Sequence, residues 1–210
     1  MIFSDRGEAG RILASKLTNY KGRSDAVILA LPRGGIPVAY EIAKELGLPV
    51  DVFVVRKLGV PGQEELAMGA IATGDMRIIN YGVVEQLGIT QQTLDEVTDR
   101  EHQELRRREQ LYRGERPPLE LRGRSVILVD DGIATGSTMR VAIAALRQLS
   151  PARIVVAVPV ATPETCEQIG AEVDEIICAA PQQLYAISQG YERFEQTTDE
   201  QVRDLLERAA

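Results

Sequence analysis

The stretch VILVDDGIATGSTM, from Val126 to Met139, changes character halfway along its length. It begins as a continuous apolar run of strand length, continues with two adjacent aspartates, and ends in small and hydroxylated residues. A continuous apolar run of this length is typical of a strand that is buried on both faces of a parallel sheet. The two acids would therefore lie at the end of a buried strand, where they need partners.

The residues after the acids have the composition of a phosphate-binding loop. Gly132 and Gly136 allow the chain to turn sharply, and Ser137 or Thr138 is placed to begin a helix. The free amide groups and the positive end of that helix would point into the loop. The hydroxyl groups of Thr135, Ser137 and Thr138 would add further donors, so the segment predicts a binding site for a phosphate group.

Asp130 and Asp131 need a different partner, because they would repel a phosphate placed beside them. Sugar hydroxyls or a divalent cation would satisfy them. A Walker A loop is excluded, since three residues separate Gly132 from Gly136 and Ser137 stands where that motif has lysine. The Gly-x-Gly-x-x-Gly fingerprint of dinucleotide-binding proteins is also absent here. The pattern favours a ligand with a phosphate at one end, a diol in the middle and a metal nearby.

Most of the chain predicts alternating helices and strands. Helices are expected over 6–20, 37–46, 137–149, 163–169 and 199–209, and buried strands over 26–31, 50–55, 125–129, 154–160 and 175–179. Residues 69–73 and 76–79 flank Gly74-Asp75, which predicts a hairpin. The order favours an α/β fold, a mainly parallel twisted sheet flanked by helices.

Ligands of such sheets bind outside the carboxyl ends of the strands. Three segments of this chain are expected there, namely 32–35, 56–66 and 130–138. We therefore expect these three loops to face a single crevice.

A different kind of segment, 83–116, predicts a helical insertion. Between residues 91 and 113 charges are dense and Gly and Pro are scarce, which indicates one long exposed helix with a thin apolar stripe. This helix has three possible roles: a surface arm, a dimer contact, or a cover for the crevice. We expect a single domain over 1–210, with 180–210 as a C-terminal hood and tail.

Composition limits the classes of partner. The net charge of −7 disfavours a broad nucleic-acid surface, because few cations are free to neutralise phosphates. No apolar run approaches the roughly 20 residues of a membrane span, so we expect a cytoplasmic protein. Cys166 and Cys178 are expected to be buried thiols, not a disulfide, because two cysteines in a chain of 210 residues are few for a disulfide scaffold.

The stretch from Val126 to Met139 resembles the phosphoribosyl-diphosphate signature of type I phosphoribosyltransferases. The resemblance extends to Leu31-Pro-Arg-Gly-Gly35, at the place of that family's diphosphate loop, and to 59–66, at the place of a mobile loop that closes over the site. The resemblance covers the core from about 26 to 179. The pattern of the whole chain is similar to that of a bacterial subgroup of this family whose substrate is unassigned.

This resemblance implies roles for particular residues. Asp130 and Asp131 would contact the ribose hydroxyls, directly or through Mg²⁺. Arg33 would face the departing diphosphate together with two further cations, Arg56 and Lys57. The 5-phosphate would be held by Ala134, Thr135, Gly136, Ser137 and Thr138, and the diphosphate also by Gly34 and Gly35.

The implied reaction is transfer of the phosphoribosyl group of phosphoribosyl diphosphate to a nitrogenous base, with Mg²⁺ as cofactor and release of diphosphate. Ala134 stands where relatives that act on 6-oxopurines generally have aspartate, which disfavours hypoxanthine and guanine. Tyr185, Tyr191 and Phe194 are candidates to stack on the base, although core packing is the commoner use of such residues. The resemblance also implies a homodimer.

Two other functions remain open from the sequence. One is a regulator that has kept the ligand site and senses phosphoribosyl diphosphate or a nucleotide. The other is a hydrolase or phosphatase acting on sugar phosphates, which fits the site residues but leaves a closing loop unexplained.

Overall fold

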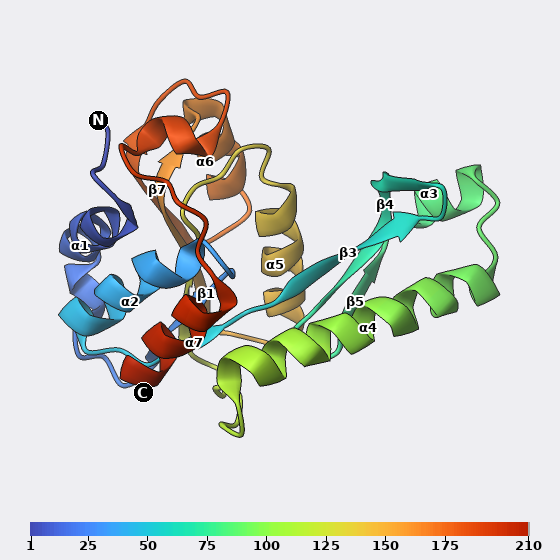
Figure 1. Cartoon of the computed structure of the whole chain (residues 1–210), viewed down its shortest axis with the longest axis horizontal. Coiled ribbons are helices and arrows are strands. Elements are labelled where there is room, and N and C mark those ends of the chain that lie inside the picture. The colour runs from blue at the N-terminus through green and yellow to red at the C-terminus, as the bar shows by residue number, and fades with distance from the viewer. Residues whose placement is uncertain (210) are drawn as a thin grey trace.

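The computed structural model describes residues 1–209, and its main layer is a five-stranded parallel sheet in the order β2-β1-β6-β7-β8 (Figure 1). The predicted α/β class is confirmed. The strands are β1 (Ala26–Ala30), β2 (Val50–Val52), β6 (Ser125–Val129), β7 (Arg153–Ala161) and β8 (Glu175–Pro181).

Helices cover both faces of this sheet, and alternate residues of each strand belong to two different cores. In β1, Ile28 packs with the helices of one face, whereas Leu29 packs with those of the other. Every residue of β1 and β6 is buried, which explains their continuous apolar sequences. One face carries α1 (Arg6–Lys16), α2 (Gly35–Leu46) and α7 (Asp199–Arg208), and the other carries α5 (Ser137–Gln148) and α6 (Pro163–Gly170).

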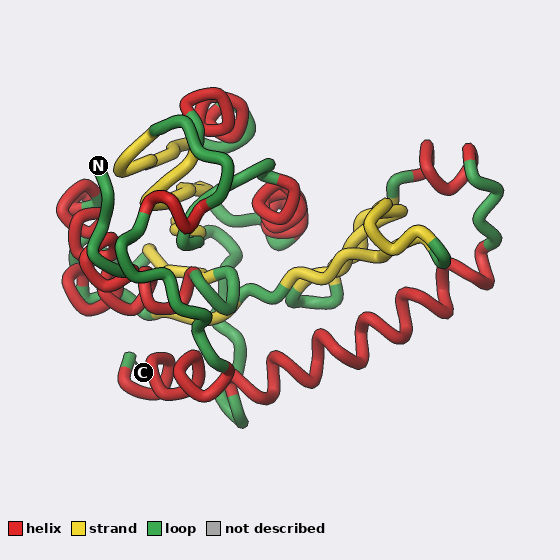
Figure 2. Tube along the Cα trace, turned by 45° about the horizontal axis from the view of Figure 1, so that its top comes forward, coloured by secondary structure: helices red, strands yellow, loops and turns green. Residues whose placement is uncertain are grey.

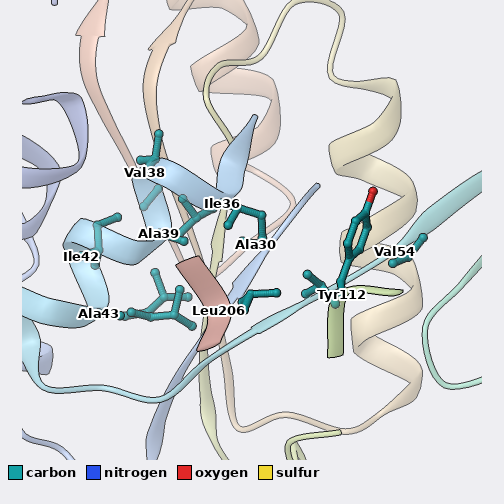
Figure 3. Packing of buried hydrophobic residues seen from close by; sticks show 14 of the residues in the cluster. Ala30, Ile36, Val38, Ala39, Ile42, Ala43, Val54, Tyr112 and Leu206 are labelled. Carbon is teal, nitrogen blue, oxygen red and sulfur yellow. The ribbon is translucent and has the colours of Figure 1, made fainter. Parts of the chain in front are cut away.

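Figure 3 shows part of the first core, in which side chains from elements distant in sequence meet. Ile36 of α2, Ala30 of β1 and Leu206 of α7 all belong to this cluster and are at most 2% exposed. The C-terminal helix is therefore part of the core.

A second, antiparallel sheet, which we call the ribbon, extends away from the main sheet together with a long helix (Figures 1 and 2). The predicted hairpin at Gly74-Asp75 is confirmed between its second and third strands. The ribbon consists of β3 (Val55–Val60), β4 (Gln63–Ala72) and β5 (Met76–Ile79), and is followed by α3 (Tyr81–Gln86) and α4 (Gln91–Arg113).

Helix α4 has the predicted bounds, 91–113, and is fixed by its thin apolar stripe. The four apolar residues of that stripe are all buried, at Leu94, Val97, Leu105 and Tyr112. At its C-terminal end, Arg113 Nε lies 2.9 Å from Asp51 Oδ2, and both side chains are at most 10% exposed. The helix is thus anchored to β2 by a buried ion pair.

Two expectations about the segment after β1 are wrong. The strand expected over 50–55 ends at Val52, and the next strand begins at Val55 in the ribbon. The loop expected over 59–66 is instead a hairpin, whose strands β3 and β4 are joined at Pro61-Gly62. Gly62 has φ of 79°, and Pro followed by a glycine of positive φ suits a two-residue turn.

The cysteines also differ from expectation, because Cys166 of α6 and Cys178 of β8 form a disulfide. Helix α6 packs against β8, and this brings the two residues together. Sequence separation alone gave no sign of the contact. Among residues 1–209, no helix combines the length and the apolar character needed to cross a lipid bilayer.

The disulfide gives a direct prediction. Denatured without reductant, the protein should show no thiol that reacts with Ellman's reagent, because both cysteines are in the bond. After reduction it should show two. A Cys166→Ser, Cys178→Ser double variant provides the blank, and two reactive thiols in the unreduced wild type would contradict the prediction.

Candidate functional site

The two predicted acids lie at the carboxyl end of β6, where β1 and β6 are neighbours. Chain order reverses between these strands, since β2 lies on one side of the pair and β7 on the other. Such a switch point is where open α/β sheets bind ligands, because the loops after the two strands diverge and leave a crevice. Asp130 is half-buried there, and Asp131 is 8% exposed.

The electrostatics of this pair are unusual. The Asp131 amide donates a hydrogen bond to Asp130 Oδ1 at 2.8 Å. Burial raises the pKa of Asp130 well above its usual range, and the adjacent charge of Asp131 raises it further. Burial also raises the pKa of Asp131, although the Arg6 guanidinium opposes that shift. A divalent cation bound here would favour the ionised forms of both acids.

The loop 32–35 after β1 lies against these acids. A side chain at Gly34 would meet Asp131, because a Cβ built there would lie 2.0 Å from Asp131 Oδ2. A Cβ at Gly35 would lie 2.7 Å from the carbonyl oxygen of Val129. Only glycine permits this approach, so the two glycines and the two acids are brought together as the sequence suggested.

Arg33 of the same loop is half-buried, and its Nη1 lies 3.7 Å from Asp199 Oδ1. The peptide bond between Pro32 and Arg33 is cis. Asp199 also accepts a hydrogen bond from the Tyr112 hydroxyl of α4 at 2.7 Å. The arginine predicted to face diphosphate is therefore held by α7 and, through the same carboxylate, connected to α4.

The loop 130–138 surrounds a cavity of about 160 Å³, which we call the loop cavity. It is lined by Asp130, 132–139 and Ile187. Gly136 has φ of 80° and is the N-cap of α5, so the amides of the first helical turn have no partner within the helix and lie beside this cavity. The hydroxyls of Thr135 and Ser137 are exposed and lie 3.1 Å apart.

The loop is held from outside by side chains of other elements. Thr165 of α6 donates a hydrogen bond to the carbonyl oxygen of Ala134 at 3.2 Å. Arg140 Nη1 of α5 donates to the carbonyl oxygen of Thr135 at 3.1 Å, and its Nε donates to Glu172 Oε1 at 2.8 Å. These contacts fix two carbonyl groups of the loop in place. Three of the loop's amides also have partners within the protein, namely those of Asp131, Ile133 and Ser137.

A second cavity, of about 330 Å³, lies beside the other acid, and we call it the arginine cavity. Two cationic side chains, Arg6 and Arg33, line it together with Asp131. Its remaining lining residues are Gly34, Phe194, Gln196 and Thr197. The acid pair thus has one cavity of amide and hydroxyl groups on one side and one of guanidinium groups on the other.

Arg6 is the site residue that sequence analysis missed. Its Nε lies 2.8 Å from Asp131 Oδ2, although 125 positions separate the two residues. Asp5 caps α1 by accepting the Glu8 amide, and this fixes where the first turn of the helix presents Arg6. In the sequence, Arg6 is one arginine among many, and no spacing motif singles it out.

Arg56 and Lys57 lie elsewhere. Both are on β3, and neither lines the loop cavity or the arginine cavity. Arg56 Nη2 lies 2.6 Å from Glu101 of α4, and Lys57 Nζ lies 3.2 Å from Glu65 on β4. Of the three cations expected to face diphosphate, the structure places Arg33 at the acid pair and these two on the ribbon.

The candidate stacking residues have separate surroundings. Tyr191 is 6% exposed, and its hydroxyl donates to the carbonyl oxygen of Asp131 at 2.5 Å, so it is a core residue. Tyr185 is fully exposed. Phe194 lines the arginine cavity, and the guanidinium carbon of Arg6 lies 3.9 Å from its ring centroid.

The donor set of the acid pair fits Mg²⁺. Magnesium takes oxygen ligands, keeps several waters, and needs only one or two carboxylates from a protein that binds it with a phosphate ligand. Within residues 1–209 there is no cluster of three or more His, Cys, Asp or Glu side chains suited to a metal. Asp130 and Asp131 would therefore share the ion with water and with oxygens of the ligand.

Comparison with known proteins identifies the family. Residues 5–185 match the family described as phosphoribosyl transferase domain. Two curated proteins of Mycobacterium tuberculosis, from strains CDC 1551 / Oshkosh and ATCC 25618 / H37Rv, are provisionally named phosphoribosyl transferases, and each is 43% identical over 209 residues. The match covers 99% of this chain and 47% of each relative, so the chain spans about half the length of these relatives.

A solved structure agrees over the whole chain. The crystal structure of TT1426 from Thermus thermophilus is 40% identical, covers 100% of both chains and has a TM-score of 0.86. Because the family match spans most of the sequence and includes both site loops, the chain belongs to the phosphoribosyl transferase domain family.

Proposed function

We propose that this chain transfers the phosphoribosyl group of phosphoribosyl diphosphate to a ring nitrogen of a nitrogenous base and releases diphosphate, with Mg²⁺ bound at Asp130 and Asp131. One observation carries the proposal. The acid pair lies between the loop cavity and the arginine cavity, which suit the two ends of a ribose that carries a phosphate and a diphosphate. Phosphoribosyl diphosphate has anions at both ends and a diol between them.

The loop cavity would hold the 5-phosphate. The amides at the start of α5 and the hydroxyls of Thr135 and Ser137 donate to its oxygens, and the positive end of the helix favours its charge. Asp130 and Asp131 accept hydrogen bonds from the ribose hydroxyls. These contacts fix the sugar, so that C1 faces the arginine cavity.

In the transfer, the bond between C1 and the diphosphate oxygen breaks as the bond to the ring nitrogen forms, and the ring nitrogen loses its proton to solvent. Positive charge grows on the sugar and negative charge on the departing oxygen. Arg33 and the Gly34 amide would stabilise that negative charge, and removing one preorganised donor of this kind typically costs roughly 10²–10³ in rate. The Gly35 amide already donates to the carbonyl oxygen of Leu31 at 3.0 Å, so Gly35 would contribute by allowing the close approach. A bound Mg²⁺ would neutralise diphosphate charge.

A second candidate is a regulator that binds the same donor without transferring its sugar. It is favoured by the ribbon, because the segment expected to close over the site is a hairpin that extends away from the main sheet (Figure 1). Water exclusion is needed for transfer but not for sensing. The family resemblance adds three further proposals to the first candidate. They are a homodimer, a cytoplasmic location and a role in nucleotide salvage.

Replacing both acids should strongly weaken binding of the donor. In Asp130→Asn, Asp131→Asn, the Kd for phosphoribosyl diphosphate with Mg²⁺ should rise at least about a hundredfold, because two charge-assisted contacts are lost. Isothermal titration measures this. Asp25→Asn, at the opposite end of β1, is the matched control and should bind as the wild type does. Unchanged affinity in the double variant would remove the acids from the site.

The loop cavity has its own test. Thr135→Val with Ser137→Ala removes two exposed hydroxyls and should raise the Kd of the donor by roughly tenfold, at about 1 kcal/mol or less for each hydrogen bond. A ribose diphosphate analogue that lacks the 5-phosphate should bind both proteins equally. Ser15→Ala on α1 controls for loss of an exposed hydroxyl elsewhere. A variant that weakens both ligands alike would contradict the assignment.

A panel of bases separates the two candidate functions. Diphosphate release should be measured with adenine, hypoxanthine, guanine, uracil and orotate in the presence of Mg²⁺ and the donor. At least one base should support release, and hypoxanthine and guanine should not, because Ala134 offers no carboxylate to a purine ring nitrogen. Tight donor binding without release by a wider panel of ring-nitrogen bases would favour the regulator.

A further inference from the structure

We propose that Arg6 is a positioning residue, which orients the Asp131 carboxylate for the donor and fastens the segment 191–197 beside it. The inference rests on the proposed function, because it assigns a role in donor binding. It depends on four contacts that link three parts of the chain: the start of α1, the end of β6, and the segment before α7.

The first contact is the ion pair between Arg6 Nε and Asp131 Oδ2, at 2.8 Å. The two side chains are only 12% and 11% exposed, so water screens their attraction weakly. A carboxylate that is buried beside a second carboxylate needs a cation or hydrogen bonds to hold its place. Arg6 supplies that cation on one oxygen, so the orientation of the Asp131 group is fixed before a ligand arrives.

The second and third contacts join Arg6 to the C-terminal segment. Its Nη1 donates a hydrogen bond to the carbonyl oxygen of Glu195 at 2.7 Å. The guanidinium carbon lies 3.9 Å from the centroid of the Phe194 ring, a distance at which a cation is attracted to the face of an aromatic ring. One planar group thus binds Asp131 with one edge, Glu195 with another and Phe194 with its face.

The fourth contact closes the arrangement. The Tyr191 hydroxyl donates to the backbone carbonyl oxygen of Asp131. The C-terminal segment therefore also contacts this aspartate directly, through a tyrosine side chain. Phe194, Gln196 and Thr197 line the arginine cavity together with Arg6 and Asp131. Arg6 therefore orients the acid and holds Phe194 and Glu195 in the cavity wall, whereas the preceding residues 192–193 are held by backbone hydrogen bonds to residues 3–4.

A lysine cannot replace this arginine. An ammonium group is a single point charge, whereas a guanidinium places several donors in one rigid plane. Lysine at position 6 would keep a positive charge near Asp131, but it would not also bind Glu195 and lie flat on Phe194. The geometry requires more of this residue than charge.

The experiment measures donor affinity in variants of the full chain. Titration of phosphoribosyl diphosphate with Mg²⁺ should give a Kd at least tenfold higher in Arg6→Gln than in the wild type, and an intermediate value in Arg6→Lys. Arg11→Gln is the matched control, because Arg11 lies on the same helix and its side chain is 54% exposed. It should bind as the wild type does. Thermal unfolding of each variant checks that it folds. If Arg6→Gln does not fold, the Kd of Arg6→Lys tests the proposal in its place.

A double-mutant cycle shows whether Arg6 acts through Asp131. In an Asp131→Asn background, Arg6→Gln should raise the Kd by a clearly smaller factor than it does in the wild type, because the carboxylate that Arg6 orients is gone and only its contacts with Glu195 and Phe194 remain. A purely structural role would give the same loss in both backgrounds and would overturn the proposal.

Two further outcomes distinguish this inference from the proposed function. If the wild type binds the donor and Arg6→Gln binds it equally or more tightly, the inference fails and the function stands, because Arg6 would then merely compete with the ligand for Asp131. If the wild type does not bind the donor at all, the proposed function fails, and the inference fails with it.

Discussion

The parallel pairing of β1 with β6, at the point where strand order reverses, is the constraint on which the site depends. Because the two strands are adjacent, their loops begin side by side at one sheet edge. Because α2 and α5 then cover opposite faces, the loops separate and leave space between them. The close approach of Gly34 to Asp131 follows from this arrangement, and so does the placement of a cavity on each side of the acid pair.

The acid pair is costly to bury, and the surrounding structure reduces that cost. Two carboxylates beside one another repel, and burial raises the pKa of both. Arg6 supplies the only guanidinium in direct contact with them among residues 1–209. An arginine contributed by the first helix of the chain therefore belongs to the same electrostatic unit as two aspartates of the central strand. The acid pair is therefore contacted by the first helix of the chain as well as by the loops that carry the family's motif.

Local patterns predicted the elements that local physics determines. The bounds of β6 and α4 agree with the sequence because a buried apolar run, a helical period and helix ends are visible within a short window. Features that depend on contacts between residues distant in the sequence could not be predicted from local patterns. The apolar run over 50–55 hid the passage from one sheet to another, and Pro61-Gly62 suggested a loop where it makes a tight turn. Arg6 and the disulfide partners meet only through tertiary packing. The site roles expected for Arg56 and Lys57 assumed that they follow a strand of the main sheet that ends at residue 55. Both residues lie instead on β3 of the ribbon.

The division of the sheet into two separate cores has a consequence for cohesion. Each face is packed against its own helices, and alternate residues of β1 belong to different clusters. A ligand lodged across the sheet edge would touch α5 on one side and the loop before α2 on the other. Its binding free energy would then stabilise both layers against unfolding, which ties the thermal stability of the chain to the occupancy of its crevice.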